Sequence, residues 1–487
     1  MRLSLLLDPE IELLNAAGLD PAIAGVTADS RAVTKGFLFA ALSGAKQDGR
    51  AYVGDALRKG AAAILAAPGL DLPAGIPYLA AKNPRRAFAR TAARFYAAQP
   101  ATIVAVTGTS GKTSVAAFAR QIWAILGRKA ASMGTLGIVG PDFERYGSLT
   151  TPDPAALHKD MAELALAGID NVALEASSHG IDQHRLDGVT LKAAAFTNLS
   201  RDHLDYHGDM ASYLAAKRRL FDTLLPRGAV AVLNADIPEY AQLRAACDAR
   251  DLRVVTYGRH GKELRLISAT PLPQGQAIEI EAYGVKQSFV LPLAGAFQAM
   301  NALAALGLVV GTGAAPHEAL QALTKLQGVP GRLERAGVRK NGAAIYVDYA
   351  HKPGALATVL EALRPHVTGK LHVVVGCGGD RDAGKRPMMG KIAVENADRV
   401  IVTDDNPRSE DPAAIRAAVL AQAPGAIEIA PREIAIRDAV AALEAGDVLA
   451  ICGKGHETGQ IVGDKVLPFD DRDEARKAIA LADGVAA

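Results

Sequence analysis

A phosphate-binding loop is predicted by the run TGTSGKT at residues 107–113. An apolar run at 103–106 precedes it and an alanine-rich stretch with helical character follows it, so the loop joins a strand to a helix. Backbone N–H groups of such a loop and the positive end of the helix bind phosphate oxygens. Lys112 would reach the outer phosphates, and the Thr113 hydroxyl would face Mg²⁺. The usual early glycine is replaced by Val106, and Gly108 takes over the turn. The loop predicts nucleotide binding, with an ordinary glycine-rich turn as the alternative.

Polar side chains follow two more strand-like runs of the same region. Residues 171–175 predict a strand that ends in Glu175, and residues 193–198 lead into LSRDHLDYHG at 199–208. In α/β sheets, ligands bind outside the carboxyl ends of the strands. We therefore expect a catalytic loop around His203, although such groups are also common on solvated surfaces. Lys217 lies on the predicted helix 210–221, where a lone lysine is usually a solvated charge.

A second binding edge is predicted near the C-terminus. Strand-like runs at 344–347, 372–375, 399–402 and 448–451 are each followed by a polar or glycine-rich stretch: DYAH, GCGGDR, TDDNPR and GKGHE. GCGGDR is a poor match to the dinucleotide-binding fingerprint, so we do not expect an NAD site.

These motifs require an α/β fold with three domains. The 487 residues exceed what one core supports. Pro100 and the run Gly328–Gly331 mark boundaries, which predicts a smaller N-terminal α/β substrate domain at 1–98. A central P-loop domain with a mostly parallel sheet follows at 99–328, and a Rossmann-like domain at 329–487.

Composition excludes several classes of protein. Lys and Arg number 54 against 52 Asp and Glu, a formal net charge of +2, which gives no reason to expect nucleic acid as a partner. Three distant cysteines (Cys247, Cys377 and Cys452) suit a reducing cytosol. The N-terminus lacks the pattern of a signal peptide, and no apolar run of about 18 residues predicts a membrane span.

The motifs together resemble the Mur ligases, the ATP-dependent amide-forming enzymes of peptidoglycan synthesis. The resemblance covers essentially the whole chain through TGTSGKT, LEASSHG, SRDHLDYHGDMASYLAAK, AMNALAA, GRLE, VDYAHKP, GCGGDRDAGKRPMMG, DDNPR and GKGHE. These motifs occur in the same order as in the member of the family that extends UDP-N-acetylmuramoyl-L-Ala-D-Glu. The resemblance implies a cytoplasmic enzyme of cell-wall synthesis, a monomer, that uses ATP and Mg²⁺.

Site residues carry over from the family by position. The ATP-binding set is Gly108, Thr109, Ser110, Gly111, Lys112, Thr113, Ser114, Asn301, Arg332, Asp348 and His351. The metal set is Thr113, Glu175, His203 and Lys217, and the catalytic set is Lys112, His203 and Lys217. The family carbamylates the lysine at position 217, which turns a cation beside Mg²⁺ into a hard oxygen ligand. That reaction requires a neutral amine, which burial favours.

Two further sets carry over for the other substrates. The UDP-sugar peptide set is Ser30, Ala45, Lys46, Gln47, Thr150, Thr151, Ser177, Gln183 and Arg185. The amino-acid set is Arg381, Asp405, Asn406, Pro407, Arg408, Gly453 and Glu457.

Arg408 in DDNPR predicts the amino acid that is added. meso-Diaminopimelate differs from L-lysine by a distal carboxylate, for which a guanidinium is a bidentate partner. The resemblance then implies that the D-Glu γ-carboxylate forms an acyl phosphate, which the diaminopimelate amine displaces. Closure of the third domain would exclude water. The alternatives are a lysine-adding or folate-type ligase of this fold and, from another class, a P-loop NTPase that switches partners.

Overall fold

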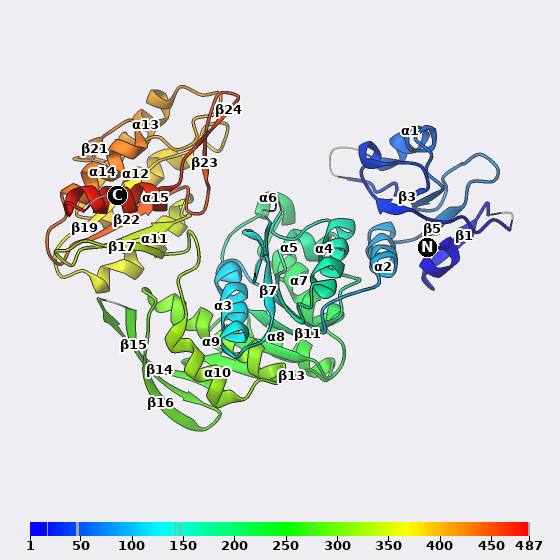
Figure 1. Cartoon of the computed structure of the whole chain (residues 1–487), viewed down its shortest axis with the longest axis horizontal. Helices are drawn as coiled ribbons and strands as arrows, with labels where there is room; N and C mark the ends of the chain where they lie inside the picture. The colour runs from blue at the N-terminus through cyan, green and yellow to red at the C-terminus, as the bar shows by residue number, and fades with distance from the viewer. Residues whose placement is uncertain are drawn as a thin grey trace. The chain divides into compact units, whose positions relative to one another are not determined.

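The computed structural model describes residues 1–16, 18–44, 48–141, 143–145, 147, 149–273 and 275–485. The chain divides into two compact units, one made of residues 1–265 with 303–322 and the other of 266–302 with 323–487. Figure 1 labels the helices and strands along the chain. The division falls inside strand β14 (Leu264–Leu272) and helix α9 (Ala296–Gly311).

The first unit begins with a small sheet in the order β1-β5-β4-β3-β2. Its strands are β1 (Ile11–Leu14), β2 (Gly25–Thr27), β3 (Phe37–Ala40), β4 (Ala63–Ala66) and β5 (Tyr78–Ala81). Only β1 pairs antiparallel, and β4 and β5 are buried throughout, as expected for interior strands covered on both faces. The helices here are η1 (Leu3–Leu6), η2 (Ser30–Ala32), η3 (Gly49–Tyr52), α1 (Val53–Arg58) and α2 (Pro84–Tyr96). Helix α2 has Pro84 in its first turn and Asn83 as its N-cap, which accepts from the Arg86 N–H.

A parallel sheet forms the rest of the first unit. Strands β7, β10, β6, β11, β12 and β13 lie side by side in that order and are all parallel. Beyond β7, the strands β8 and β9 continue the sheet with antiparallel pairing. The strands are β6 (Thr102–Thr107), β7 (Ala130–Gly134), β8 (Gly137–Gly140), β9 (Phe143–Arg145), β10 (Asn171–Glu175), β11 (Leu191–Phe196), β12 (Val230–Asn234) and β13 (Arg253–Gly258). The helices are α3 (Lys112–Ile125), α4 (Pro154–Leu166), α5 (Ser178–Asp182), α6 (Leu204–His207), α7 (Met210–Arg219), η4 (Leu220–Leu224), α8 (Tyr240–Ala249) and α10 (Pro316–Ala322).

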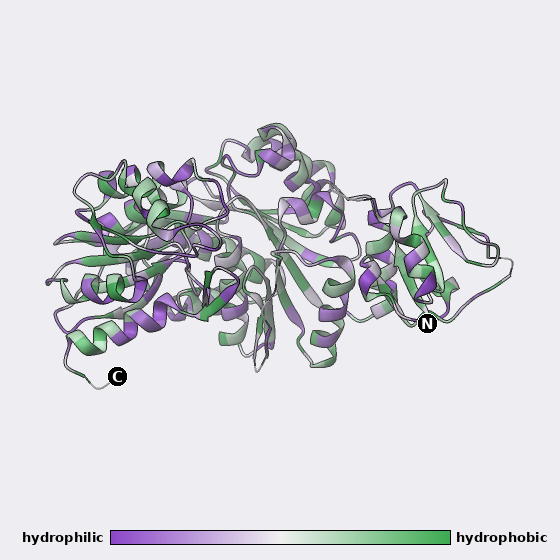
Figure 2. Cartoon of the chain, turned by 90° about the horizontal axis from the view of Figure 1, so that it is seen from above, coloured by the Kyte–Doolittle hydropathy of each residue, from purple (hydrophilic) through white to green (hydrophobic). Residues whose placement is uncertain are grey.

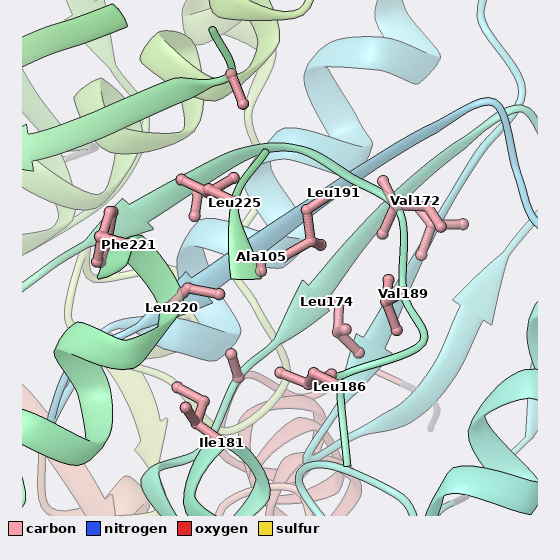
Figure 3. Close-up of a cluster of buried hydrophobic side chains, with 14 of the residues drawn as sticks. Ala105, Val172, Leu174, Ile181, Leu186, Val189, Leu191, Leu220, Phe221 and Leu225 are labelled. Carbon is pink, nitrogen blue, oxygen red and sulfur yellow. The ribbon is translucent and has the colours of Figure 1, made fainter. Parts of the chain in front are cut away.

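One hydrophobic layer holds this sheet to its covering segments. Ala105, Leu174 and Leu191 come from three neighbouring strands and pack in one cluster with Phe221 and Leu225, which follow α7 (Figure 3). Burying each leucine contributes about 1.5–3 kcal/mol relative to leaving it exposed. The layer therefore fixes α7 against the sheet, and α7 carries Lys217.

The second unit contains β14, β15 (Gly275–Ala282) and β16 (Val285–Leu291), with β15 and β16 antiparallel, and η5 (Leu323–Lys325). A six-stranded sheet follows in the order β17-β18-β22-β19-β20-β21, parallel except for the β17–β18 pair. The strands are β17 (Glu334–Val338), β18 (Ala344–Asp348), β19 (Leu371–Val375), β20 (Arg399–Val402), β21 (Ile427–Glu428) and β22 (Val448–Cys452), with a separate hairpin of β23 (Gly459–Val462) and β24 (Lys465–Pro468). The helices are α11 (Pro353–Leu363), η6 (Arg364–His366), α12 (Lys385–Asn396), α13 (Pro412–Leu420), α14 (Arg432–Ala441) and α15 (Asp471–Ala482).

The predicted α/β class is confirmed, and many strands inside the sheets are coloured as hydrophobic in Figure 2. The strand predicted at 171–175 matches β10 residue for residue. The stretch predicted to be helical at 210–221 is helical throughout: α7 ends at Arg219, and a π-helical turn follows that brings Leu220 and Phe221 into the core. Within the described residues, no helix is both long and apolar enough to span a membrane.

Candidate functional site

Glycine is required at both ends of the predicted phosphate-binding loop. Gly108 follows β6 with φ of 144°, and a Cβ there would lie 1.9 Å from the Thr197 Oγ1. Gly111 precedes α3 with φ of 88°, a region that residues with a Cβ rarely adopt. The glycine at 108 thus lets the loop approach Thr197, directly after β11, more closely than any side chain would allow.

Asn198 holds the loop in shape. The Ser110 N–H donates to the Asn198 Oδ1 (3.0 Å), and the Asn198 Nδ2 donates back to the Ser110 carbonyl (3.2 Å). The Thr109 N–H donates to the Asn198 carbonyl (2.9 Å). The loop is therefore held by the segment that follows β11, and these contacts use the N–H groups of Thr109 and Ser110.

Two lysine side chains of the site converge on one carbonyl. The Lys112 Nζ donates to the carbonyls of Gly108 and Thr109, each at 2.9 Å, and the Lys217 Nζ donates to the same Gly108 carbonyl at 2.8 Å. Lys217 is 1% exposed and its Nζ lies 4.4 Å from the centre of the Tyr213 ring. Burial, and then the Lys112 charge, lower the pKa of Lys217 well below its usual range.

Glu175 lies where the loop enters α3. The Thr113 Oγ1 donates to its Oε2 (3.0 Å), and the Thr135 N–H donates to its Oε1 (2.8 Å). A Cβ at Gly134 would meet the Glu175 Oε1 at 2.0 Å, so the carboxylate packs directly on that backbone. The site thus pairs a hydroxyl with a buried carboxylate at the carboxyl ends of adjacent strands.

His203 belongs to a cluster of aromatic rings. Its ring centre lies 4.9 Å from that of His179 and 6.3 Å from that of Tyr213, and its Nε2 lies 3.5 Å from the Asp202 carboxylate. His207 contacts both His179 and Tyr213. Burial lowers the pKa values of His179 and His207, which favours neutral rings. Tyr213 therefore connects His203 with the buried Lys217.

The residues near the loop fit Mg²⁺ rather than a metal that requires an all-protein cage. Mg²⁺ is usually held by one or two carboxylates together with substrate phosphates and water, and Thr113 with Glu175 supplies hard oxygens of that kind. Among the residues that the structure describes, no group of three or more His, Cys, Asp and Glu side chains is placed to hold a metal ion.

Most residues of the predicted UDP-sugar peptide set form one network beside Glu175. The Thr151 Oγ1 donates to the Glu175 carbonyl (2.8 Å) and accepts from the Ser177 N–H (3.0 Å). Arg185 donates to the Thr151 carbonyl and to the Gln183 Oε1, and Thr150 contacts Thr135. Ser30 lies apart from this network in η2, where its carbonyl accepts from Lys59. Ala45, Lys46 and Gln47 lie outside the described residues.

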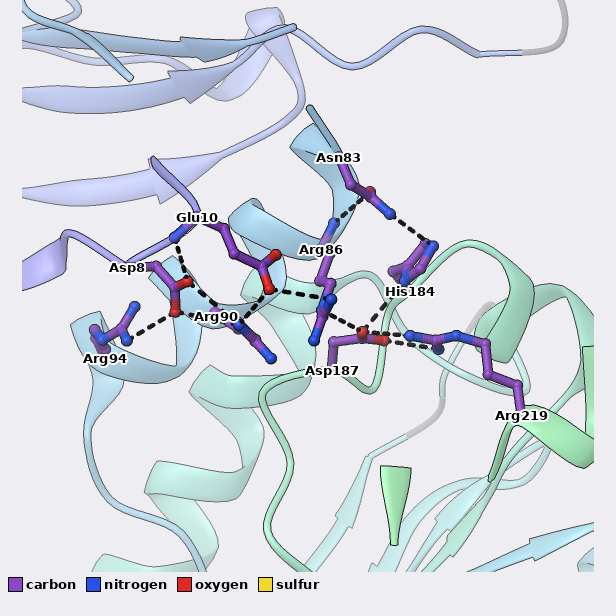
Figure 4. A network of polar contacts seen from close by, with 9 residues as sticks. All are labelled: Asp8, Glu10, Asn83, Arg86, Arg90, Arg94, His184, Asp187 and Arg219. Atoms are coloured by element: carbon purple, nitrogen blue, oxygen red, sulfur yellow. Dashed lines mark hydrogen bonds and ion pairs between the residues drawn. The ribbon is translucent and has the colours of Figure 1, made fainter. Parts of the chain in front are cut away.

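Asp187 connects this network to the N-terminal part of the first unit. Its carboxylate, 2% exposed, contacts the Arg86 Nε of α2 (3.4 Å), the His184 Nδ1 (3.2 Å) and the Arg219 guanidinium of α7 (Figure 4). The His184 Nε2 lies 2.9 Å from the Asn83 Nδ2 at the start of α2. One buried carboxylate therefore joins α2, the loop that carries Arg185 and the helix that carries Lys217.

Most of the predicted amino-acid residues gather at one edge of the six-stranded sheet. The Asn406 Nδ2 donates to the Glu457 Oε2 (2.8 Å), and a Cβ at Gly453 would lie 2.6 Å from the Asp405 Oδ2. Arg408, at φ of 53°, donates from NH1 to the Gly379 carbonyl (2.8 Å). Pro407 packs against Gly379, where a Cβ would lie 2.0 Å from the Pro407 carbonyl oxygen, and Arg381 is exposed nearby in the same loop.

The remaining predicted nucleotide residues form a second chain of contacts in the same unit. The Asn301 Nδ2 donates to the Gln298 Oε1 (3.0 Å), and the Gln298 Nε2 donates to the Arg332 carbonyl (3.1 Å). The Arg332 guanidinium lies 5.1 Å from the Tyr349 ring centre, and the His351 Nδ1 lies 2.8 Å from the Tyr349 carbonyl. Desolvation raises the pKa of Asp348 to about 6.

Five residues of these networks were missed by the sequence reasoning: Asn198, Tyr213, Gln298, Thr135 and Lys454. Asn198 ends a predicted strand, and Tyr213 and Lys454 lie inside the motifs SRDHLDYHGDMASYLAAK and GKGHE, although their contacts have no local signal. Thr135 and Gln298 lie outside the quoted motifs and acquire their roles from contacts with distant segments.

A strand, glycine loop and helix with a lysine and threonine at the helix start, and a carboxylate on the neighbouring strand, define a P-loop protein of the α/β class. Family models match the chain as the Mur ligase middle domain at 106–309, the Mur ligase glutamate ligase domain at 331–455 and the Mur ligase family catalytic domain at 22–96. The chain therefore belongs to the Mur ligase family.

Several relatives match along nearly the whole chain. A protein of Caulobacter vibrioides is 56% identical over 466 residues, which cover 94% of this chain and 96% of the relative. A protein of Bradyrhizobium diazoefficiens is 55% identical over 477 residues, which cover 96% of this chain and 98% of the relative. Both are named UDP-N-acetylmuramoyl-L-alanyl-D-glutamate--2,6-diaminopimelate ligase. A solved structure of a ligase with that name matches with a TM-score of 0.72 and 33% identity over 94% of this chain and 95% of the other. MurF ligase from Thermotoga maritima, in complex with ADP, shares the fold with a TM-score of 0.61 and 20% identity over 94% and 98%.

Proposed function

We propose that this chain adds meso-2,6-diaminopimelate to the D-Glu γ-carboxylate of UDP-N-acetylmuramoyl-L-Ala-D-Glu in peptidoglycan precursor synthesis, with ATP converted to ADP and phosphate. The observation that carries the proposal is the similarity at 55–56% identity to ligases of that name over 94% or more of the chain. Lysine addition is the runner-up, and the carboxyl-binding capacity of Arg408 argues against it.

ATP would bind with its phosphates at the loop and helix start formed by residues 108–114. Lys112 would compensate their charge, and Asn301, Arg332, Asp348 and His351 would surround the rest of the nucleotide. Thr113 and Glu175 would hold one Mg²⁺ and His203 would lie near a second, with Lys217, as a carbamate, supplying a further oxygen ligand. Bound Mg²⁺ would neutralise charge on the phosphates. The burial of Lys217 supports the carbamate, because only the neutral amine reacts with CO₂ and the reaction releases a proton.

The reaction would proceed in two displacements. A γ-carboxylate oxygen of D-Glu attacks the γ-phosphorus, and the bond from that phosphorus to ADP breaks. The amine of diaminopimelate then attacks the acyl carbon, loses a proton, and phosphate leaves with the bonding pair. The protein's part is to align two anions that otherwise repel. Thr151 supports this arrangement, because it links Ser177 and Arg185, proposed to bind the dipeptide, directly to the Glu175 backbone.

We also propose a cellular location, an oligomeric state and domain boundaries for this chain. We place the enzyme in the cytoplasm, which suits three buried free thiols at Cys247, Cys377 and Cys452. We propose a monomer with small-molecule substrates, whose three domains divide at 98/99 and 328/329.

Phosphate release by the pure protein tests the function. The assay contains ATP, Mg²⁺ and the UDP-dipeptide, with meso-diaminopimelate, with L-lysine or with neither. We expect release only with diaminopimelate. Release only with lysine would overturn the choice of amino acid, and release that ignores both would favour an NTPase switch.

A further inference from the structure

Lys454 is an unexplained buried cation beneath the proposed amino-acid pocket. It directly follows Gly453 at the end of β22, and its side chain is 0% exposed. Lysine is almost never fully buried unless it is paired. Because the side chain is enclosed, Lys454 cannot touch a substrate, and its role must act through its neighbours.

The three N–H bonds of the ammonium group find three acceptors. The Lys454 Nζ donates to the Gly459 carbonyl (2.6 Å), to the Asn406 Oδ1 (3.2 Å) and to the Glu457 Oε2 (3.2 Å). An ammonium has three donors and no acceptor, so this set satisfies it. Two of the acceptors belong to residues that we propose to contact diaminopimelate.

These contacts determine which way the Asn406 amide faces. Its Oδ1 accepts from Lys454 and also from the Ile461 N–H (2.9 Å), while its Nδ2 donates to the Glu457 Oε2 (2.8 Å). Lys454 and the Ile461 N–H can only donate. A flipped amide would place its own N–H groups against both donors and its oxygen against a carboxylate, which leaves buried polar groups unpaired.

We propose that Lys454 is a positioning residue that sets the donor and acceptor pattern of the amino-acid pocket; this rests on the proposed function. The Asn406 Oδ1 already accepts two hydrogen bonds, so the side chain can offer the substrate only an N–H of its Nδ2. Such a donor would bind a substrate carboxylate. Glu457 takes both contacts on Oε2, so it offers Oε1 and suits an ammonium group. The pocket is thereby matched to the ammonium and carboxylate groups at one end of an amino acid. The positive charge of Lys454 compensates the negative charge at the Oε2 of Glu457.

Lys454→Met removes the ammonium and keeps an unbranched chain. We expect the KM for diaminopimelate to rise at least about 10-fold, the equivalent of one lost hydrogen bond to a charged group. The KM values for ATP and for the UDP-dipeptide should change by less than about twofold. Lys477→Met is the matched control, because Lys477 forms an ion pair with Glu474 at the same three-residue spacing but is exposed.

The comparison separates a positioning role from a merely structural one. If Lys454→Met does not fold, Lys454→Gln, which keeps donors without the charge, is measured in the same way, and Lys454→Arg should recover part of the lost affinity. Unchanged KM values in a folded variant, or equal increases for all three substrates, would overturn the inference alone. Absence of diaminopimelate-dependent phosphate release by the wild-type protein would overturn the proposed function and this inference with it.

Discussion

At the scale of single residues, Lys217 is the group whose environment conflicts most with its charge. It shares the Gly108 carbonyl with Lys112, so two ammonium groups meet at one acceptor. Burial and this repulsion both favour the neutral amine. Conversion to a carbamate would remove the repulsion and place an anion where Mg²⁺ could bind.

Lys217→Ala is expected to lower kcat by at least about 100-fold, the usual loss when one group that stabilises transition-state charge is removed. Added acetate or formate should restore part of the activity, because a small carboxylate can occupy the space of the carbamate. The control is Lys159→Ala, which truncates an exposed lysine of α4. Phosphate release at saturating substrates is the measurement, and wild-type turnover by Lys217→Ala would remove the carbamate from the mechanism.

At the scale of elements, the Asp187 network is what joins α2 to α7. Arg86 and Arg219 reach the same buried carboxylate from these two helices, and His184 reaches it from the loop between α5 and β11. A second buried carboxylate, Asp8, accepts from Arg90 and Arg94 of α2. Buried ion pairs therefore supplement the apolar packing of α2, in which Phe88 is fully buried.

Asp187→Asn should destabilise the first unit by about 3 kcal/mol, because it leaves two arginines without their shared buried partner. Urea unfolding followed by the fluorescence of Trp123, the single tryptophan, reports on this unit. The matched control is Asp29→Asn, which breaks an exposed pair with Arg31 and should cost at most about 1 kcal/mol. Equal effects of the two substitutions would show that the Asp187 network is not a stabilising attachment.

At the scale of the whole molecule, buried neutral histidines make stability depend on pH. His158 of α4 is 1% exposed, and burial lowers its pKa to about 4 from an ordinary 6.5. His456, in the second unit, is lowered to about 4 for the same reason. Between pH 4 and pH 6.5 these histidines are protonated in the unfolded chain but not in the folded chain. Stability is therefore fully present above pH 6.5 and is lost as the pH falls towards 4.

His158→Met should reduce the loss of unfolding free energy between pH 7.5 and pH 5 by about 2 kcal/mol relative to wild type. Trp123 fluorescence in urea at the two pH values measures this difference, because both residues belong to the first unit. His317→Gln, a change to an exposed histidine of α10, serves as control. A loss as large in His158→Met as in wild type would mean that His158 is protonated in the folded state.

How far the sequence predicted the fold can be judged from particular elements. The apolar run before Glu175 predicted β10 without error, because a buried parallel strand needs an unbroken run of apolar residues. The stretch 210–221 is helical as predicted, but the change to a π-helical turn at Leu220–Leu224, which brings Leu220 and Phe221 into the core, has no local signal. The division of the chain inside α9 and β14 has no local signal at all.

The sequence by itself determined the P-loop, the strand ends that carry Glu175 and the Asp405–Arg408 run, and the family, because these depend on residue types at short spacing. Only the tertiary structure decided the states of the charged groups. Lys217 looked like a solvated charge and is buried against Tyr213. Lys454 lies in the motif GKGHE, but only the structure shows that it is buried and donates to Asn406 and Glu457. The physical reason is that the free energy of a charged group depends on its burial, its hydrogen-bond partners and the nearby charges. Most of these come from residues that are distant in the chain.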